Sequence, residues 1–182
     1  MNLKHNFLIA MPGLGGDYFA NTLTYICEHN ADGAMGIIVN RPSDMSLMEL
    51  LAQVGLPTNH KLLDTNVFEG GPVAIERGMV LHSNNRTFES SADLGAGLCL
   101  STAMEVLAAI ANDEGPDRYL VALGYAGWGE GQLEDEIANN VWLTAPADQA
   151  VLFESAWQDK LTDAADLLGI NLNLIAAKPG HA

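Results

Sequence analysis

The sequence predicts an α+β fold with a mixed β-sheet, built as a single domain over residues 1–182. Segments typical of strands and helices do not follow the strict β-α-β alternation of a doubly wound parallel sheet. An Asp32–Gly33 pair between two strand-like segments predicts a tight hairpin, and therefore antiparallel pairing, near the N-terminus. A chain of 182 residues is long enough to bury its own core without disulfides or metals.

The N-terminal part of the chain is predicted to form three strands and one helix. The strands are rich in β-branched and aromatic residues and cover 6–11, 22–29 and 34–40. The segment 12–16 is a loop by composition. It lacks the third glycine of a dinucleotide-binding fingerprint and the Gly-Lys-Ser/Thr of a phosphate loop, so we interpret it as structural. A helix over 46–54 places its leucines on one face.

The remaining elements follow from the same patterns. Strands are predicted at 66–69, 78–82, 118–123 and 141–144. Helices are predicted from residue 102, over 132–140 and over 147–168, the last with a break near Phe153. The polar segment 83–93 and the glycine-rich segment 124–131 are predicted to be loops.

The chain is strongly acidic. Its 8 Lys and Arg stand against 23 Asp and Glu, for a net charge of −15 at pH 7. The basic residues are scattered, whereas nucleic-acid-binding proteins neutralise phosphates with Lys and Arg, so direct nucleic-acid binding is disfavoured. An anionic membrane surface is disfavoured for the same reason. Because neither a membrane-spanning stretch nor a secretory leader is recognisable, we expect a cytoplasmic protein.

No motif indicates a cofactor, a metal or a catalytic residue. Cys27 and Cys99 lie among apolar neighbours and are interpreted as buried free thiols. On a strand Cys27 and His29 would share one face, which leaves open a metal site completed from elsewhere in the chain. Neither a G-x-S-x-G nor an S-x-x-K motif occurs, so the sequence favours a protein without enzymatic activity.

Polar and aromatic residues are densest around the glycine-rich segment 124–131. There a flat aromatic surface precedes a helix whose first turns carry glutamine and glutamate on one face. A second glycine-rich turn at 70–71 is able to supply backbone donors, although a packed turn, bulge or tight crossover explains either segment more simply. The candidate ligand-binding residues are His29, Asn30, Asn40, Gly70, Gly71, Tyr125, Trp128, Gln132 and Glu136.

Several segments, taken in order, resemble one bacterial family. They include GAMGIIVNRP at 33–42, GGPV at 70–73, RGMVLH at 77–82 and GYAGW at 124–128. Together with 7–12, 25–30, 132–134, 140–143 and 180–182 they span nearly the whole chain, which resembles the AlgH/YqgE proteins. The resemblance implies an α+β fold with a mixed, partly barrel-like sheet. It implies no catalytic residues: most members carry no assigned function, and some are labelled transcriptional regulators tied to alginate production.

Two classes of function are favoured. The first is a non-catalytic regulatory or binding protein that acts through a protein partner. No catalytic motif is present, and so acidic a molecule is poorly suited to bind DNA directly. The second is a small-molecule-binding protein or enzyme with a pocket at the glycine-rich turns. A direct DNA-binding transcriptional regulator is the least favoured alternative. The sequence leaves the ligand, the partner and the oligomeric state open.

Overall fold

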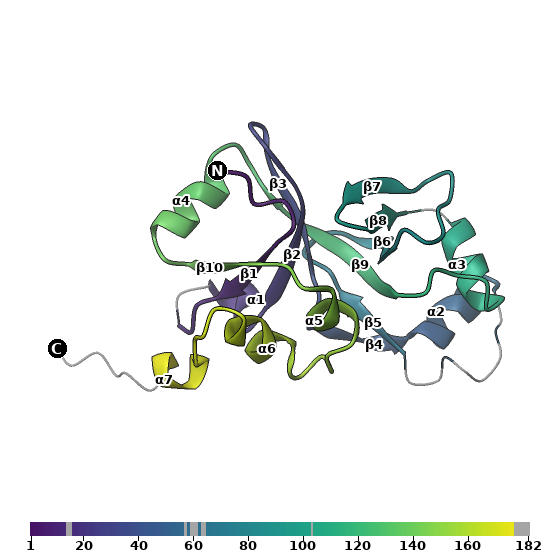
Figure 1. Ribbon diagram of the computed structural model, residues 1–182. Helices are drawn as coiled ribbons and strands as arrows, with labels where there is room; N and C mark the ends of the chain where they lie inside the picture. The colour runs from purple at the N-terminus through teal and green to yellow at the C-terminus, as the bar shows by residue number, and fades with distance from the viewer. Residues whose placement is uncertain (14–15, 57, 59–61, 63–64, 103, 177–182) are drawn as a thin grey trace. The chain divides into compact units, whose positions relative to one another are not determined.

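A computed structural model describes residues 1–13, 16–56, 58, 62, 65–102 and 104–176 (Figure 1). Contacts within the chain divide it into two compact units. The first unit combines Met1–Asn40 with Gly127–Ala182, and the second is Arg41–Ala126. The single-domain boundaries expected from the sequence therefore stay a prediction. Leu14 and Gly15 of the expected N-terminal loop, and the C-terminal residues 180–182, lie outside the described residues.

The first unit is built on an antiparallel sheet with the order β10-β1-β2-β3. Its strands are β1 (Asn6–Ala10), β2 (Leu23–Asn30), β3 (Gly33–Ile38) and β10 (Trp142–Pro146). The predicted hairpin joins β2 to β3 at Gly33, which has φ of 137°. A Cβ atom there would lie 2.1 Å from the Trp128 carbonyl oxygen, so this turn requires glycine.

Short helices complete the first unit. They are α1 (Gly16–Phe19), α4 (Gln132–Ala138), α5 (Gln149–Phe153), α6 (Lys160–Asp166) and α7 (Leu172–Ala176). The expected break near Phe153 is present, since α5 ends there and α6 begins seven residues later, at Lys160. Asp148 caps α5, because its side chain accepts a hydrogen bond from the Val151 N–H at 3.0 Å.

The second unit contains a mixed sheet with the order β4-β5-β9-β6-β8-β7. Its strands are β4 (Pro42–Ser46), β5 (Asn66–Glu69), β6 (Val73–Ser83), β7 (Ala92–Gly95), β8 (Leu98–Ser101) and β9 (Tyr119–Trp128), whose last two residues belong to the first unit. The β5–β9 pair is parallel and the other pairs are antiparallel, which confirms the predicted mixed sheet.

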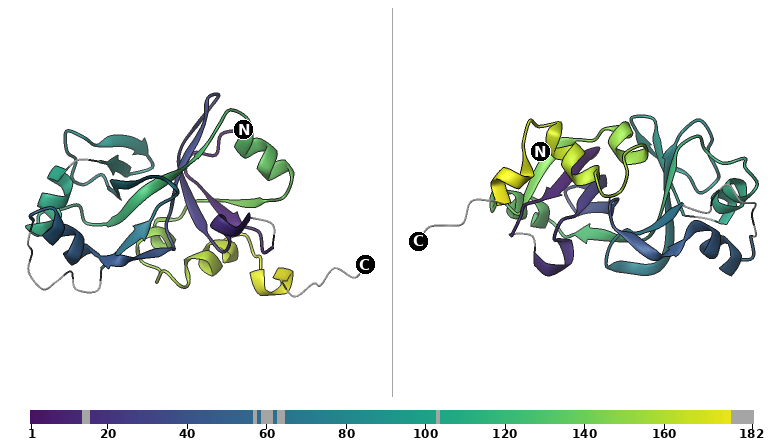
Figure 2. Two further views of the ribbon diagram at one scale, coloured as in Figure 1. Left: turned by 180° about the vertical axis from the view of Figure 1, so that it is seen from behind. Right: turned by 90° about the horizontal axis from the view of Figure 1, so that it is seen from below.

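Helices α2 (Leu47–Gln53) and α3 (Met104–Ala111) lie side by side at one end of the second unit (Figures 1 and 2). Ser46 and Glu49 form a capping box at the start of α2, with hydrogen bonds of 3.2 and 2.8 Å. Apolar side chains of both helices pack with those of β5, β6 and β9 into one core; its fully or nearly fully buried members include Leu47, Leu51, Val67, Val80, Val106 and Val121.

The prediction of a loop over 124–131 is wrong for its first half, because β9 continues to Trp128. The glycine content predicted a turn, but these glycines allow two backbone segments to approach each other closely. A Cβ atom on Gly71 would lie 2.0 Å from the Tyr125 carbonyl carbon, and one on Gly70 would lie 2.3 Å from the Gly124 oxygen. The segment 83–93 is likewise not all loop, since β7 begins at Ala92.

Candidate functional site

The candidate ligand-binding residues divide between the two units. The first unit holds His29, Asn30, Asn40, Trp128, Gln132 and Glu136, and the second holds Gly70, Gly71 and Tyr125. A single pocket formed by both glycine-rich turns therefore stays a prediction.

His29 joins the N-terminal segment to helix α4. The Leu3 backbone N–H donates to Nδ1 at 2.9 Å, so Nδ1 carries no proton and Nε2–H donates to the Glu134 carboxylate at 2.6 Å. The His29 side chain is 2% exposed, whereas that of Glu134 is 38% exposed. The backbone N–H of Glu134 and the His29 side chain both lower the pKa of Glu134. Both ring nitrogens are thus engaged in structural bonds.

Glu136 accepts hydrogen bonds from two indoles. The Nε1–H groups of Trp128 and Trp142 donate to its Oε2 at 2.9 and 2.7 Å. Its other oxygen accepts from the Gln132 amide at 3.0 Å, and the Gln132 oxygen accepts from the Gly129 N–H at 3.0 Å. This network holds α4 against the strands that carry the two tryptophans.

The two indoles belong to an aromatic cluster that also contains Phe19. The ring centroids of Trp128 and Trp142 lie 6.2 Å apart, and those of Phe19 and Trp142 lie 5.5 Å apart, both in edge-on arrangements. Trp128 and Trp142 are 6% and 3% exposed. Sequence reasoning missed Glu134 and Trp142. A buried indole needs an acceptor, so the two tryptophans on either side of an acidic helix were an available signal for a partner such as Glu136.

The remaining candidates in the first unit shape its turns. The Asn40 side chain accepts from the Leu23 N–H at 2.8 Å and donates to the Asn21 carbonyl at 2.9 Å. The Asn30 side chain accepts from the Asp32 N–H at 2.8 Å, inside the β2–β3 hairpin. In the second unit, Gly70 and Gly71 give the close backbone approach to β9 described above. The backbone of Tyr125 pairs with that of Val73 in the β6–β9 ladder. These contacts give each candidate a structural role, and its part in ligand binding stays a prediction.

The two cysteines and His29 were the residues considered as possible metal ligands. Cys27 and Cys99 are both free and buried, as predicted, and burial raises the pKa of Cys27 to about 12. Cys27 and His29 are both buried in β2, but the β2–β3 register shifts between Ile26 and Glu28, and His29 has no free nitrogen for a metal. Within the ranges that the structure describes, no group of three or more His, Cys, Asp and Glu is placed to hold a metal ion.

A hydrogen-bonded chain runs through the second unit from Phe88 to His82. The carbonyl of Ser83 accepts from His82 Nδ1–H at 2.9 Å, so in the neutral ring Nε2 accepts from the Ser101 hydroxyl at 2.8 Å. The Ser101 oxygen in turn accepts from the Ser91 hydroxyl at 2.8 Å, and Ser91 accepts from the Phe88 N–H. Burial lowers the pKa of His82, which favours this neutral form. The chain satisfies buried polar groups between β6, β8 and the segment before β7.

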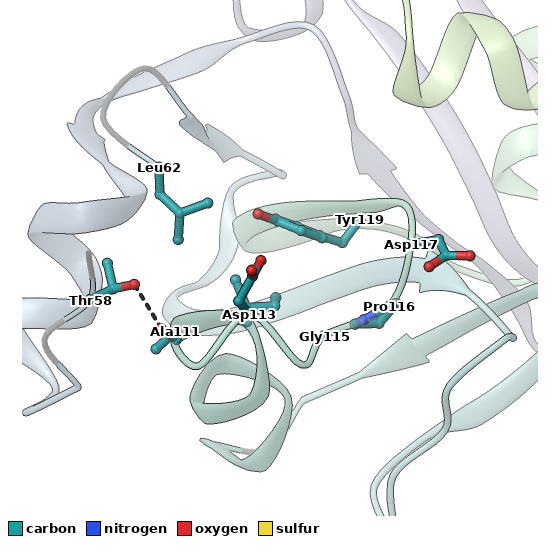
Figure 3. A pocket seen from close by; sticks show the side chains of 9 residues that line it. Thr58, Leu62, Ala111, Asp113, Gly115, Pro116, Asp117 and Tyr119 are labelled. Atoms are coloured by element: carbon teal, nitrogen blue, oxygen red, sulfur yellow. Dashed lines mark hydrogen bonds between the residues drawn. The ribbon is translucent and has the colours of Figure 1, made fainter. Parts of the chain in front are cut away.

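A pocket of about 290 Å³ opens beside the C-terminal end of α3 (Figure 3). The Thr58 hydroxyl donates to the Ala111 carbonyl at 2.8 Å in its wall. Burial and the charge of Asp113 raise the pKa of Tyr119, so its phenol stays protonated. The lining residues are Thr58, Leu62, Ile110, Ala111, Asp113, Gly115, Pro116, Asp117 and Tyr119. None of the candidate residues lies among them.

A second cavity, of about 150 Å³, lies between α2 and α3 over the sheet and is more apolar. We call it the β6 groove; its lining residues are Leu50, Val54, Glu76, Gly78, Val80, Thr102, Met104, Leu107, Val121 and Leu123. Val54 and Met104 are 37% and 48% exposed, and Ile75, next to Glu76, is 66% exposed. Sequence reasoning missed this groove, because its walls come from four separate segments.

Comparisons with known proteins agree with the resemblance. The AlgH-like family model matches residues 7–173. A UPF0301 protein of Pseudomonas fluorescens is 50% identical over 182 residues, covering 99% of this chain and 96% of the relative. The UPF0301 protein AlgH of Pseudomonas aeruginosa is 48% identical over 183 residues, with the same coverage.

Two solved structures are similar as well. The solution structure of AlgH from Pseudomonas aeruginosa has a TM-score of 0.82 and 46% identity, covering 100% of this chain and 97% of that one. A crystal structure from Corynebacterium diphtheriae, 18% identical, has a TM-score of 0.76 over 97% of this chain and 92% of that one, which shows a shared fold alone. The likeness to AlgH confirms the α+β class with its curled, partly barrel-like sheet. In the described ranges, no helix has the length and apolar character needed to cross a membrane. The family model and the relatives agree over almost the whole sequence, and the chain belongs to the AlgH-like family.

Proposed function

We propose that the protein is a non-catalytic binding protein that acts through a protein partner, and that the partner docks in the β6 groove. The observation that carries this proposal is the apolar rim of the groove. Single exposed hydrophobic side chains are ordinary, but several around one concavity are typical of an interaction site. Val54 and Met104 are exposed at this rim. Leu50, Leu107 and Leu123 line the same groove.

The size of the groove favours a protein over a free small molecule. Ligand pockets usually have volumes of about 300–1,000 Å³. The β6 groove, at about 150 Å³, has room for one or two side chains inserted from a partner. A partner also suits the net charge of −15, because a regulator this acidic acts more readily on a protein than on DNA.

The hydrogen bonds of the first unit also support binding without catalysis. A general acid or base must reach a substrate proton. His29, Gln132 and Glu136 instead bind to their own neighbours, so a small-molecule or enzymatic function at the glycine-rich turns has less structural support.

Site-specific photo-crosslinking in cells tests the proposal. A photoreactive residue is placed at Val54, which lines the groove and is 37% exposed, and in a matched control at Leu174, which is 68% exposed and lies in the first unit. We expect a discrete adduct with one protein from position 54, lost when Met104→Asp places a charge on the rim, while circular dichroism shows an intact fold. Equal adducts from both positions, or adducts that persist with Met104→Asp, would refute the docking site.

A further inference from the structure

The edge of strand β6 that continues beyond β8 is open. The ladder between β6 and β8 begins with Val80 opposite Ser101. Between β6 and β9, the register passes from Val73 directly to Gly78. Over the part of the chain that the structure describes, Val73–Met79 therefore has no strand beside it on the β8 side. An unpaired edge of this kind is a template for another extended segment.

This open edge borders the β6 groove. Glu76 and Gly78 belong to the edge and also line the groove, together with Met104 at the start of α3. Gly78 has no positive φ, and a Cβ atom added there would meet nothing within 4 Å. A neighbouring chain is thus able to approach the backbone of β6 closely at this point while its side chains enter the groove.

We propose that the partner supplies an extended segment that adds a strand to β6 along Val73–Met79. Every second side chain of this segment faces the β6 groove. Apolar side chains at these positions fill the groove, and a lysine or arginine at one of them lies opposite Glu76. The inference rests on the proposed function and names the chemistry of the partner at that same site. Main-chain hydrogen bonds give such a complex its affinity, and the groove selects the side chains.

Charge complementarity identifies the occupant as a basic segment of another protein. Glu76 is exposed at the groove, in a chain with a net charge of −15. Antiparallel pairing of two copies through this edge would bring their Glu76 side chains together, and like charges placed opposite each other destabilise a strand pair.

A helical partner fits these observations less well. A helix satisfies its backbone groups internally, so it would leave the edge of β6 unpaired. An extended segment pairs with that edge and presents every second side chain to the groove.

The test is a selection of random displayed peptides on the full-length protein, with peptides that also bind the Gly78→Leu variant discarded. Gly78→Leu fills the open space on the groove floor and is expected to fold, which thermal unfolding checks. We expect enriched peptides with alternate apolar residues and one lysine or arginine, and at least a tenfold loss of affinity with Glu76→Gln. N-methylation along the best synthetic peptide is then expected to abolish binding at every second residue, since only those N–H groups face β6.

The outcomes separate the two proposals. Peptides that tolerate N-methylation at every position, or that lose binding with helical spacing, would overturn strand addition, and the crosslink from Val54 would show whether docking in the groove survives. Strand addition would also be overturned if no peptide is enriched while that crosslink is still observed. Absence of any crosslink from Val54 would refute the proposed function itself. A crosslink from Val54 to a second copy of this chain would overturn the choice of a basic partner.

Discussion

The ammonium group of Lys160 donates to the backbone carbonyl of Val39 at 3.1 Å. A second bond, of 2.9 Å, joins it to the carbonyl of Leu152. Lys160 is 3% exposed, and burial lowers the pKa of its side chain to about 8. A lysine inside the first unit thus bonds to carbonyl groups at the end of the N-terminal sheet segment and in α5.

Replacement of this lysine should change how stability depends on pH. Between about pH 8 and 10.5 the unfolded chain binds the Lys160 proton and the folded chain releases it, so the free energy of unfolding rises with pH in this window. Relative to Lys160→Met, the wild type should gain up to roughly 3 kcal/mol across it. Urea unfolding at several pH values measures the difference in free energy of unfolding between the wild type and Lys160→Met. Protonation changes of the buried Tyr25 and Cys27 side chains largely cancel in this difference, because both proteins contain them. Parallel curves for both proteins would contradict the prediction.

Glu136 should stabilise the first unit through its two indole partners. Glu136→Ala leaves the N–H groups of Trp128 and Trp142 without their acceptor in a nearly buried cluster, and we expect a loss of roughly 2–4 kcal/mol. Gln132→Ala, on the exposed side of the same carboxylate, should cost less than about 1 kcal/mol. Urea unfolding of both variants provides the measurement. Equal losses of stability in both variants would show that the hydrogen bonds from the two indoles contribute no more than the bond from Gln132.

Gly71, just before β6, and Gly78, within β6, form a matched pair for testing why glycine occurs at these two positions. A Cβ atom on Gly71 would collide with the Tyr125 backbone, so Gly71→Ala should cost at least about 2 kcal/mol. Gly78 faces open space, so Gly78→Ala should be neutral or stabilise the fold by up to about 1 kcal/mol. Thermal unfolding compares the two. A tolerated alanine at Gly71 would show that the two backbones lie farther apart than described.

Thr24 offers a way to stabilise the protein. Its hydroxyl is fully buried in β2 and has no hydrogen-bond partner among the residues that the structure describes. Thr24→Val keeps the shape of the side chain and removes the unsatisfied polar atom, so we expect a gain of about 1 kcal/mol in the free energy of unfolding. Calorimetry of the variant measures this gain. A less stable variant would imply that a water molecule satisfies the hydroxyl.

Local patterns predicted much of the fold. The Asp32–Gly33 hairpin, the helix after Ser46 and the break near Phe153 are confirmed, because each depends on residues close together in the chain. The continuation of β9 through Gly124 was missed because it depends on a distant segment, Gly70–Gly71, packing against it. A glycine in a sequence does not show whether a neighbouring segment excludes a side chain, as at Gly71, or leaves open space, as at Gly78.

The candidate site was less predictable for a similar reason. Polar residues were chosen for what their side chains are able to bind, but hydrogen-bond partners lie far away in sequence. His29 and Glu134 are 105 residues apart, and their contact satisfies both. The β6 groove carries no polar motif, so the sequence offered no signal that its apolar walls would meet.

All 3 tryptophans of the chain, at positions 128, 142 and 157, lie in the first unit, and the second unit has none. Indole emission therefore reports the melting of the first unit alone, whereas far-ultraviolet dichroism records both. Coincident transitions in the two signals would establish one cooperative folding unit, and separate transitions would establish two.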